Sequence, residues 1–240
     1  MVLARNNLLG VLSQKDHKIL EPHLRKVHAA KGTVLHEQGV NVNFAYFPCG
    51  ASLVAFKVLL PDGREIDAAL IGREGAIGGI VSAGYLPAYA RASVEFPGDF
   101  WKIDVGELES AKLRSTPLSN LLARYSDCLL AQLFQSTACN ASHPIEQRTA
   151  KWLLTAMDRT GTPEIPWTHE QLGNMLGIGR SYMSRILQKF KAEGVLETRR
   201  GRLYVRNAGR LHHLGCGCRD AVCHHFEAVL QGVYPFSAIH

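Results

Sequence analysis

The C-terminal tail gathers side chains that bind transition metals. Four of them stand close together: Cys216, Cys218, Cys223 and His224. Thiolates and imidazoles at short spacing are typical ligands of zinc and related metals. The same stretch also fits a small helix over about 221–230 that docks on the preceding domain with buried thiols. The tail therefore predicts either a structural helix or a metal- or thiol-redox-responsive sensor.

A second set of side chains suits contact with nucleic acid. Residues 143–210 hold 12 Lys and Arg against 6 Asp and Glu, whereas residues 1–142 hold 14 against 13. A localised excess of positive charge is typical of DNA-binding domains, because neutralising phosphates supplies much of their affinity. The candidate DNA contacts in this segment are Thr168, Arg180, Ser181, Tyr182, Arg185, Lys189, Arg199 and Arg202.

Two short helices must position these contacts. Thr168–Gln171 has the pattern of a capping box, which begins a helix. Gly177 ends that helix, since glycine readily adopts the left-handed conformation. A second helix is expected from Gly179 to about Ala192, with a basic outer face. Its expected buried residues are Met183, Ile186, Leu187 and Phe190. Such a pair predicts a helix-turn-helix, whose second helix enters the major groove.

A basic hairpin follows the second helix. Val195–Arg199 and Arg202–Arg206 are predicted as strands, with Arg200 and Gly201 as the turn between them. This hairpin is the expected wing of a winged helix. We expect its Arg199, Arg200 and Arg202 to lie near phosphates, and Arg180 and Arg185 to read bases.

A long helix precedes the basic segment. Residues spaced alternately four and three apart form one seam: Leu118, Leu122, Tyr125, Leu129, Gln132, Ser136 and Cys139. This heptad spacing predicts a helix that pairs with a second copy over about 116–139. The alternative is an ordinary amphipathic helix that lies on the preceding domain.

The N-terminal part has a different sequence pattern, which predicts mostly strands. Residues 8–28 are predicted as helix, divided by Pro22. Short apolar runs separated by Gly and Pro then predict antiparallel strands to about Asp104, followed by a short helix over 105–113. The fold class is α+β: an N-terminal jelly-roll-like β-roll, a long dimerisation helix and a winged helix-turn-helix. The expected domains are residues 1–110, 111–142 and 143–240.

Composition excludes several classes. The 240-residue chain is 46% hydrophobic and 20% charged, as in globular proteins. No apolar run approaches the ~18 residues that span a bilayer, and the first residues do not have the pattern of a secretory signal. We therefore expect a cytoplasmic protein without a membrane partner, and six cysteines that do not form disulfides. The tail lacks an orienting acid and the chain lacks a phosphate-cradling Gly-Lys motif, so an enzyme is not expected.

In this order the elements resemble the Crp/Fnr regulators of bacterial transcription. The resemblance is carried by Ala138–His143, Glu146–Arg148, Trp152–Leu154, Asp158-Arg159, Thr168–Arg180 and Gly194–Gly201. It implies a β-roll of the cyclic-nucleotide-binding type, a homodimer on a palindromic promoter site, and RNA polymerase as a partner. It also implies that Arg180, Ser181 and Arg185 face base edges. Many members have Glu where this chain has Ser181, which leaves the half-site sequence open.

The sensor segment departs from nucleotide-binding members of that family. Those members hold the ribose with a Gly-Glu pair and the phosphate with an Arg. Here Gly78-Gly79 occupies the position of the pair, whereas Arg91 matches the phosphate Arg. A hydrogen bond to a charged group is worth ~1.5–3 kcal/mol, so its loss argues against cyclic AMP. The chain has no Cys before Cys49, which argues against the iron–sulfur cluster of the oxygen-sensing branch. The effector, the operator and the sign of regulation stay open.

Overall fold

The computed structural model describes residues 5–199 and 202–235. The chain begins with two short helices, α1 (Asn7–Gly10) and α2 (Gln14–Leu20), whose first turns are capped by Asn6 and Ser13. The prediction of a helix as far as residue 28 is wrong. Pro22 lies in a 3₁₀ turn, η2 (Glu21–His23), and strand β1 (Arg25–Ala29) follows. Pairing of β1 along its whole length with β7 (Gly98–Asp104) explains the difference, because these long-range hydrogen bonds outweigh local helix propensity.

The predicted β-roll is confirmed as two antiparallel sheets, ordered β1–β7–β3 and β2–β6–β4–β5. The remaining strands are β2 (Val34–His36), β3 (Phe44–Pro48), β4 (Leu53–Leu59), β5 (Glu65–Ile71) and β6 (Arg91–Phe96). Buried side chains from both sheets, including Val54, Val94 and Phe100, fill the space between them. The β4–β5 hairpin turns at Gly63, whose φ of 84° suits glycine.

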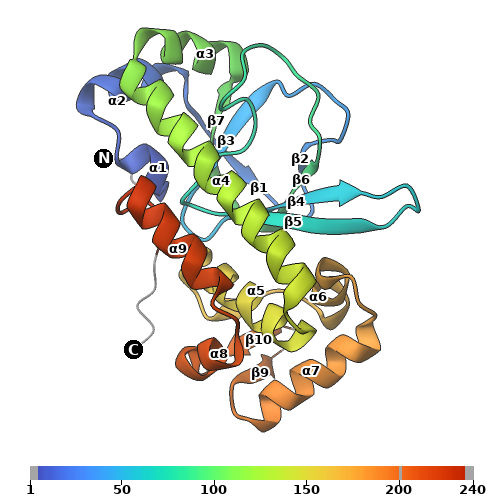
Figure 1. The fold of residues 1–240 in the computed structure, drawn as a ribbon. Helices are drawn as coiled ribbons and strands as arrows, with labels where there is room; N and C mark the ends of the chain where they lie inside the picture. Colours follow the sequence, from blue (N-terminus) through green and yellow to red (C-terminus); the bar gives the residue numbers. More distant parts are fainter. Residues whose placement is uncertain (1–4, 200–201, 236–240) are drawn as a thin grey trace.

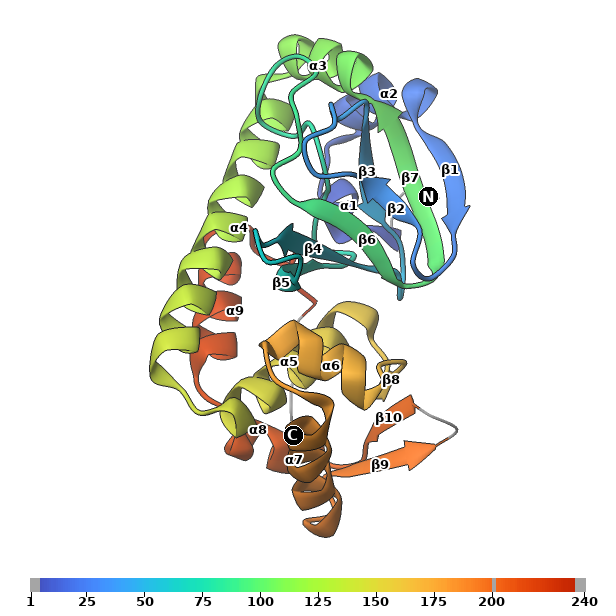
Figure 2. The same cartoon turned by 90° about the vertical axis from the view of Figure 1, so that its right-hand side faces the viewer.

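Helix α3 (Val105–Arg114) leads into the long helix α4 (Thr116–Ser142), which Ser115 caps. Figure 2 shows α4 at the margin of the molecule, with the β-roll and α9 (Cys218–Val229) on the same side of it. The predicted seam faces inward: Leu118, Leu122, Tyr125, Gln132 and Cys139 are all buried within the chain. Leu118, Leu122 and Tyr125 belong to the cluster that the roll and α9 share, so this face is already packed within the protomer. Pairing of the helix with a second copy stays a prediction, and it would have to use another face.

The opposite face of α4 is open to solvent. Phe134 is 65% exposed and Leu130 is 46% exposed. With Ala123, Asp127, Thr137 and Ala141, which are also exposed, they repeat the spacing of four and three residues. We call Ala123, Asp127, Leu130, Phe134, Thr137 and Ala141 the outer seam. The helix thus carries two heptad seams, and among the described residues the inner seam is packed whereas the outer seam is exposed.

The predicted winged helix-turn-helix is confirmed. Its elements are α5 (Ile145–Thr160), β8 (Glu164–Ile165), α6 (His169–Leu176), α7 (Arg180–Ala192), β9 (Leu196–Arg199), β10 (Arg202–Val205) and α8 (Ala208–Leu214). The strands form an antiparallel sheet in the order β8–β10–β9. Trp167, Phe190 and Leu203 are among the buried side chains that hold the helices on this sheet. None of the helices in the described ranges is long and apolar enough to cross a bilayer.

The tail helix α9 begins earlier than predicted and docks elsewhere. It packs mainly along α4, as Figure 1 shows, and it also contacts α5 of the winged domain. Phe226 and Leu230 join the cluster that contains Leu122. Beyond α9, the Val233 carbonyl accepts a hydrogen bond of 2.8 Å from Asn7. The long apolar seam of α4 offers more surface to bury than the small winged domain, which explains the docking.

Buried ion pairs fasten α5 to its neighbours. Arg159 forms a 2.9 Å ion pair with Glu74, and both side chains are 1% exposed. The Arg159 guanidinium also donates to the Leu70 carbonyl and to Gln132 of α4. Arg219 of α9 donates to both carboxylate oxygens of Asp158, at 2.7 and 2.8 Å. These contacts set the position of the winged domain against the β-roll.

Candidate nucleic-acid interface

The start of the helix-turn-helix is held by local hydrogen bonds. The Thr168 hydroxyl accepts from the Gln171 amide at 3.1 Å, and the Gln171 side chain accepts from the Thr168 amide at 3.0 Å. Gly177 ends α6 with a φ of 71°. At Gly173 a Cβ would lie 2.9 Å from the Ile178 carbonyl, so the turn packs too closely on α6 for a larger residue. The predicted capping box and glycine turn are both confirmed.

Helix α7 presents the predicted polar face to solvent. Its exposed residues are Arg180, Ser181, Tyr182, Arg185, Gln188 and Lys189. The four expected core residues, from Met183 to Phe190, are all buried. The Arg185 guanidinium lies 5.3 Å from the centre of the Tyr182 ring, a cation–π contact that orders it. In Figure 1, α7 lies at the end of the molecule away from the β-roll.

The wing carries arginines that already have carboxylate partners. Arg199 lies 2.9 Å from Glu197, and Arg202 lies 2.8 Å from Glu164. Both arginine side chains are 57% exposed. Exposed ion pairs contribute only ~0–1 kcal/mol, so a phosphate can displace these carboxylates. The predicted phosphate contact Arg200 lies outside the described residues.

The helix-turn-helix also touches the β-roll. Lys31 donates to the Pro166 carbonyl at 2.6 Å and to the Gln171 side chain at 3.2 Å. A hollow of about 550 Å³ separates the β4–β5 hairpin from the turn after α6, with Lys57 and Asp67 on one wall and Ile178 on the other. Burial raises the pKa of Asp67 to about 7, although the charge of Lys57 opposes this. The β-roll is therefore in direct contact with the helix-turn-helix.

The residues proposed for an effector pocket line different hollows. Gly79 lines one of about 280 Å³, whereas Arg91 lines another of about 230 Å³. Arg91 is held at 2.8 Å by Glu37 and also bonds Glu65. Gly78 and Gly79 both have positive φ, of 82° and 58°.

Both of these glycines are tightly packed. A Cβ on Gly78 would lie 2.1 Å from the His36 ring, and one on Gly79 would lie 2.6 Å from Val105. No larger side chain fits at either position without a shift of its neighbours.

The metal candidates of the tail fall into two places. Cys216 and Cys218 lie beside Cys139 and His143, whose ligand atoms are all within 4.8 Å of one another. Cys223 instead packs into the core under α4, where burial raises the pKa of its thiol to about 11. His224 points to solvent. Cys223 and His224 therefore do not belong to the cluster, because five residues along a helix turn Cys223 about 140° away from Cys218.

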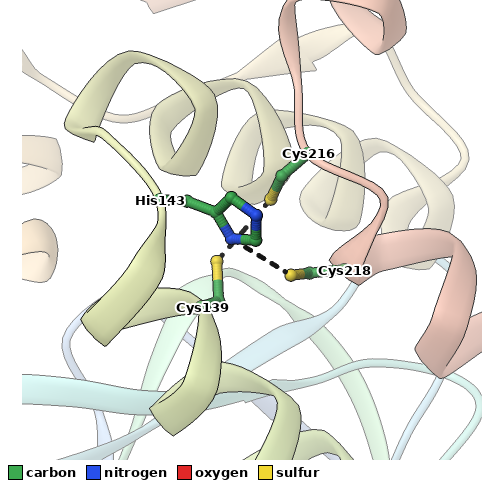
Figure 3. A group of neighbouring side chains, drawn as sticks. All are labelled: Cys139, His143, Cys216 and Cys218. Atoms are coloured by element: carbon green, nitrogen blue, oxygen red, sulfur yellow. Dashed lines mark hydrogen bonds between the residues drawn. The ribbon is translucent and has the colours of Figure 1, made fainter.

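Cys139 and His143 escaped the sequence prediction as ligands. They are four residues apart at the end of α4, a spacing that places two side chains on one helix face. Figure 3 shows the three thiols and the imidazole converging. The sulfurs of Cys139 and Cys216 are 3.6 Å apart, and the Cys218 sulfur is 3.5 Å from His143 Nδ1. We call these four residues the Cys₃His cluster.

Comparison with known proteins supports the fold. Residues 147–214 match the family model of the Crp-like helix-turn-helix domain. Many solved structures resemble most of the chain, whereas no curated protein matches it. A putative Crp/Fnr regulator from Eubacterium rectale is 22% identical, with a TM-score of 0.63, over 86% of this chain and 96% of that one.

Two further structures are similar over most of their length. FixK2 from Bradyrhizobium japonicum is 18% identical with a TM-score of 0.67, over 80% of this chain and 98% of its own. The c-di-GMP-responsive global regulator CLP from Xanthomonas campestris is 14% identical with a TM-score of 0.65, over 80% of this chain and 99% of its own. At these identities the likeness concerns the fold.

Proposed function

We propose that this chain, a Crp/Fnr-type transcriptional regulator by its fold and its helix-turn-helix domain, binds a two-fold symmetric promoter site as a homodimer. The structural neighbours are regulators, and we propose regulation by DNA binding rather than enzymatic catalysis. Because chromosomal DNA is the target, we place its action in the cytoplasm.

The exposed face of α7 carries this proposal. Arg180 is the first residue of the helix, and the N-terminal residues of a recognition helix approach base edges. A bidentate arginine–guanine contact discriminates between bases by ~1–3 kcal/mol. Arg185, ordered by Tyr182, extends the same reading surface. We assign Thr168, Lys189, Arg199 and Arg202 to the phosphate backbone, and Ser181 and Tyr182 to the groove.

The outer seam of α4 supports the homodimer. A long helix that leaves Leu130 and Phe134 exposed, with heptad spacing, is suited to pair with its symmetry mate. A two-fold dimer places two recognition helices in successive major grooves, about 34 Å apart. The operator is then a palindrome with half-sites one helical turn apart.

We propose an effector other than cyclic AMP. A ribose-binding carboxylate at position 79 would collide with Val105. Arg91, the candidate phosphate ligand, is already held by Glu37 and Glu65. Calorimetry tests this proposal: saturable binding of cyclic AMP in the micromolar range would overturn it.

The direct test of DNA reading begins with selection of bound duplexes from a random library, which defines the operator. Binding of Arg180→Ala and Arg199→Ala is then measured on operator and scrambled duplexes across a salt series. Arg180→Ala is expected to weaken operator binding ~5- to 150-fold for each half-site, with little effect on the scrambled duplex. Arg199→Ala is expected to weaken binding to both duplexes. It should also lower the slope of the logarithm of affinity against the logarithm of salt concentration by about one for each phosphate that the protein no longer neutralises.

Arg124→Ala is the matched control, because Arg124 is an exposed arginine on α4. It is expected to bind both duplexes like the parent protein. Equal losses on both duplexes for Arg180→Ala would make Arg180 a phosphate contact and would sink the proposed reading face. Run-off transcription with RNA polymerase on an operator-bearing promoter then distinguishes activation from repression.

A further inference from the structure

We propose that the Cys₃His cluster is a zinc site, in which Cys139, His143, Cys216 and Cys218 bind one Zn²⁺ tetrahedrally. The site joins the end of α4 to the connection between α8 and α9. This inference is independent of DNA recognition, since none of its ligands lies on α6, α7 or the wing.

The spacing of the ligand atoms suits a single zinc ion. Zinc binds sulfur at ~2.3 Å and imidazole nitrogen at ~2.0–2.1 Å, so tetrahedral ligands stand about 3.5–3.8 Å apart. The Cys139–Cys216 sulfurs are 3.6 Å apart and the Cys218 sulfur is 3.5 Å from His143 Nδ1. All four ligand atoms lie within 4.8 Å of one another. Small adjustments of the side chains would therefore close the site around one ion.

The ligand set also matches zinc chemically. Three thiolates and one imidazole are a common closed set in structural zinc sites, which leave no position for substrate or water. A multi-iron cluster needs its cysteines farther apart, because inorganic sulfides lie between the irons. The short separations observed here therefore favour one ion over a cluster.

The surroundings of the cluster balance its charge. Zinc with three thiolates carries a net charge of −1, which is costly to bury unless compensated. Lys151 is only 7% exposed, and its positive charge acts on Cys139. Gln135 donates a hydrogen bond of 3.1 Å to the Cys218 sulfur. Neighbours of this kind orient metal ligands and stabilise their charged form.

The backbone around the four ligands brings them together without a bound metal. Cys139 lies in the last turn of α4, and His143 is the C-cap residue, whose backbone amide donates to the Cys139 carbonyl. Pro144 follows directly, so the helix cannot continue. Gly215 and Gly217 flank Cys216. The loop passes close to α5 at Gly215, where a Cβ would lie 3.7 Å from the Ala150 Cβ. The two halves of the site thus come from two segments that are distant in the sequence, the end of α4 and the connection between α8 and α9.

The position of the site suggests what the ion does. The chain passes from the long helix into the winged domain between His143 and Ile145. The zinc ion would tie this hinge to the first turn of α9, which packs back along α4. It therefore acts as a clamp that fixes the angle between the dimerisation helix and the DNA-binding domain.

Metal content of untagged protein, purified without chelator, is the first test. We expect about one zinc per chain. Cys139→Ser, Cys216→Ser and Cys218→Ser are each expected to lose it. Cys223→Ser and His224→Ala are the matched controls on α9 and should retain full zinc. Iron with acid-labile sulfide, zinc retained after all three ligand substitutions, or a Cys139–Cys216 disulfide in place of metal would each overturn the proposal.

Three further measurements complement the cysteine substitutions, and two of them use the wild-type protein. Co²⁺ exchanged into the wild-type protein should give the visible and charge-transfer absorption of a tetrahedral thiolate site. His143→Cys, which restores four ligands, should keep the metal that His143→Ala loses. Removal of the ion by a chelator should lower Tm by roughly 5–10 °C. A cobalt spectrum of octahedral type, or a Tm that a chelator leaves unchanged, would contradict a zinc clamp.

Discussion

The two faces of α4 carry the same spacing of residues and serve different purposes. The inner face buries Leu118, Leu122 and Tyr125 against the roll and α9. The outer seam leaves Leu130 and Phe134 in contact with solvent. The inner face includes polar contacts as well, because Gln132 accepts from the buried Arg159. One face therefore holds the protomer together, whereas the other is available to a second copy.

This difference between the two faces of α4 separates the stability of the protomer from the assembly of the dimer. Substitutions on the inner face are expected to act on the free energy of unfolding of the protomer. Substitutions on the outer seam are expected to act on the monomer–dimer equilibrium and to leave the fold intact. Variants of each face, compared by unfolding and by sedimentation, test this division.

The largest effect on stability is expected at the polar end of the inner face. Arg159→Met leaves Glu74 buried without its ion-pair partner, which costs ~3–5 kcal/mol. Urea unfolding at pH 7 measures the loss. Adding Glu74→Gln should recover part of it, since the uncompensated charge is then removed. A loss below ~1 kcal/mol would mean that this ion pair does not fasten α5 to the β-roll.

The apolar part of the inner face comes next. Leu122 is 2% exposed, and Leu122→Ala is expected to cost ~2–5 kcal/mol through reduced burial and the cavity left behind. The midpoint of urea unfolding should fall while its slope stays the same. A stability equal to that of the parent protein would show that this face is not part of the folded core.

Outer-seam substitutions should change assembly instead. The double variant Leu130→Glu, Phe134→Glu places like charges across the proposed interface, so the protein is expected to sediment as a monomer. Its circular dichroism should match the parent, because exposed substitutions rarely cost more than ~0.5 kcal/mol. If the double variant remains a dimer, the homodimer uses another surface.

The smallest effect on assembly and stability is expected for an exposed residue outside the outer seam. Leu113 is 85% exposed at the end of α3, outside both faces of α4. Leu113→Ser should leave sedimentation unchanged and stability within ~0.5 kcal/mol of the parent. Partial dissociation of this variant would extend the interface beyond α4.

The features of the chain that local forces set were predictable from the sequence. Thr168 and Gln171 bond each other across three residues, and Gly177 ends α6 through its own backbone freedom. Residues Met183 and Phe190 share a face set by the helical period. The winged helix-turn-helix was therefore predictable residue by residue.

Features that depend on competition between distant partners for one segment were not predictable from the sequence. Arg25–Ala29 forms a strand because β7 offers an open edge, a fact that no neighbour in sequence reveals. The 4-3 seam of α4 was visible, but its partner was not, since the roll and α9 reach it from distant parts of the chain. Cys223 and His224 seemed to complete a metal site because they are close in sequence, whereas α9 directs them elsewhere.

The sequence by itself determined the helix-turn-helix, the basic charge of its domain and the β-rich texture of the N-terminal half. These features depend on hydrogen bonds and periodicities that span a few residues. Only the tertiary structure decided which face of α4 is free and which cysteines meet. Cys139 and Cys216 are 77 residues apart along the chain. Their approach depends on the packing of α9 along α4, which buries apolar surface gathered from the whole molecule.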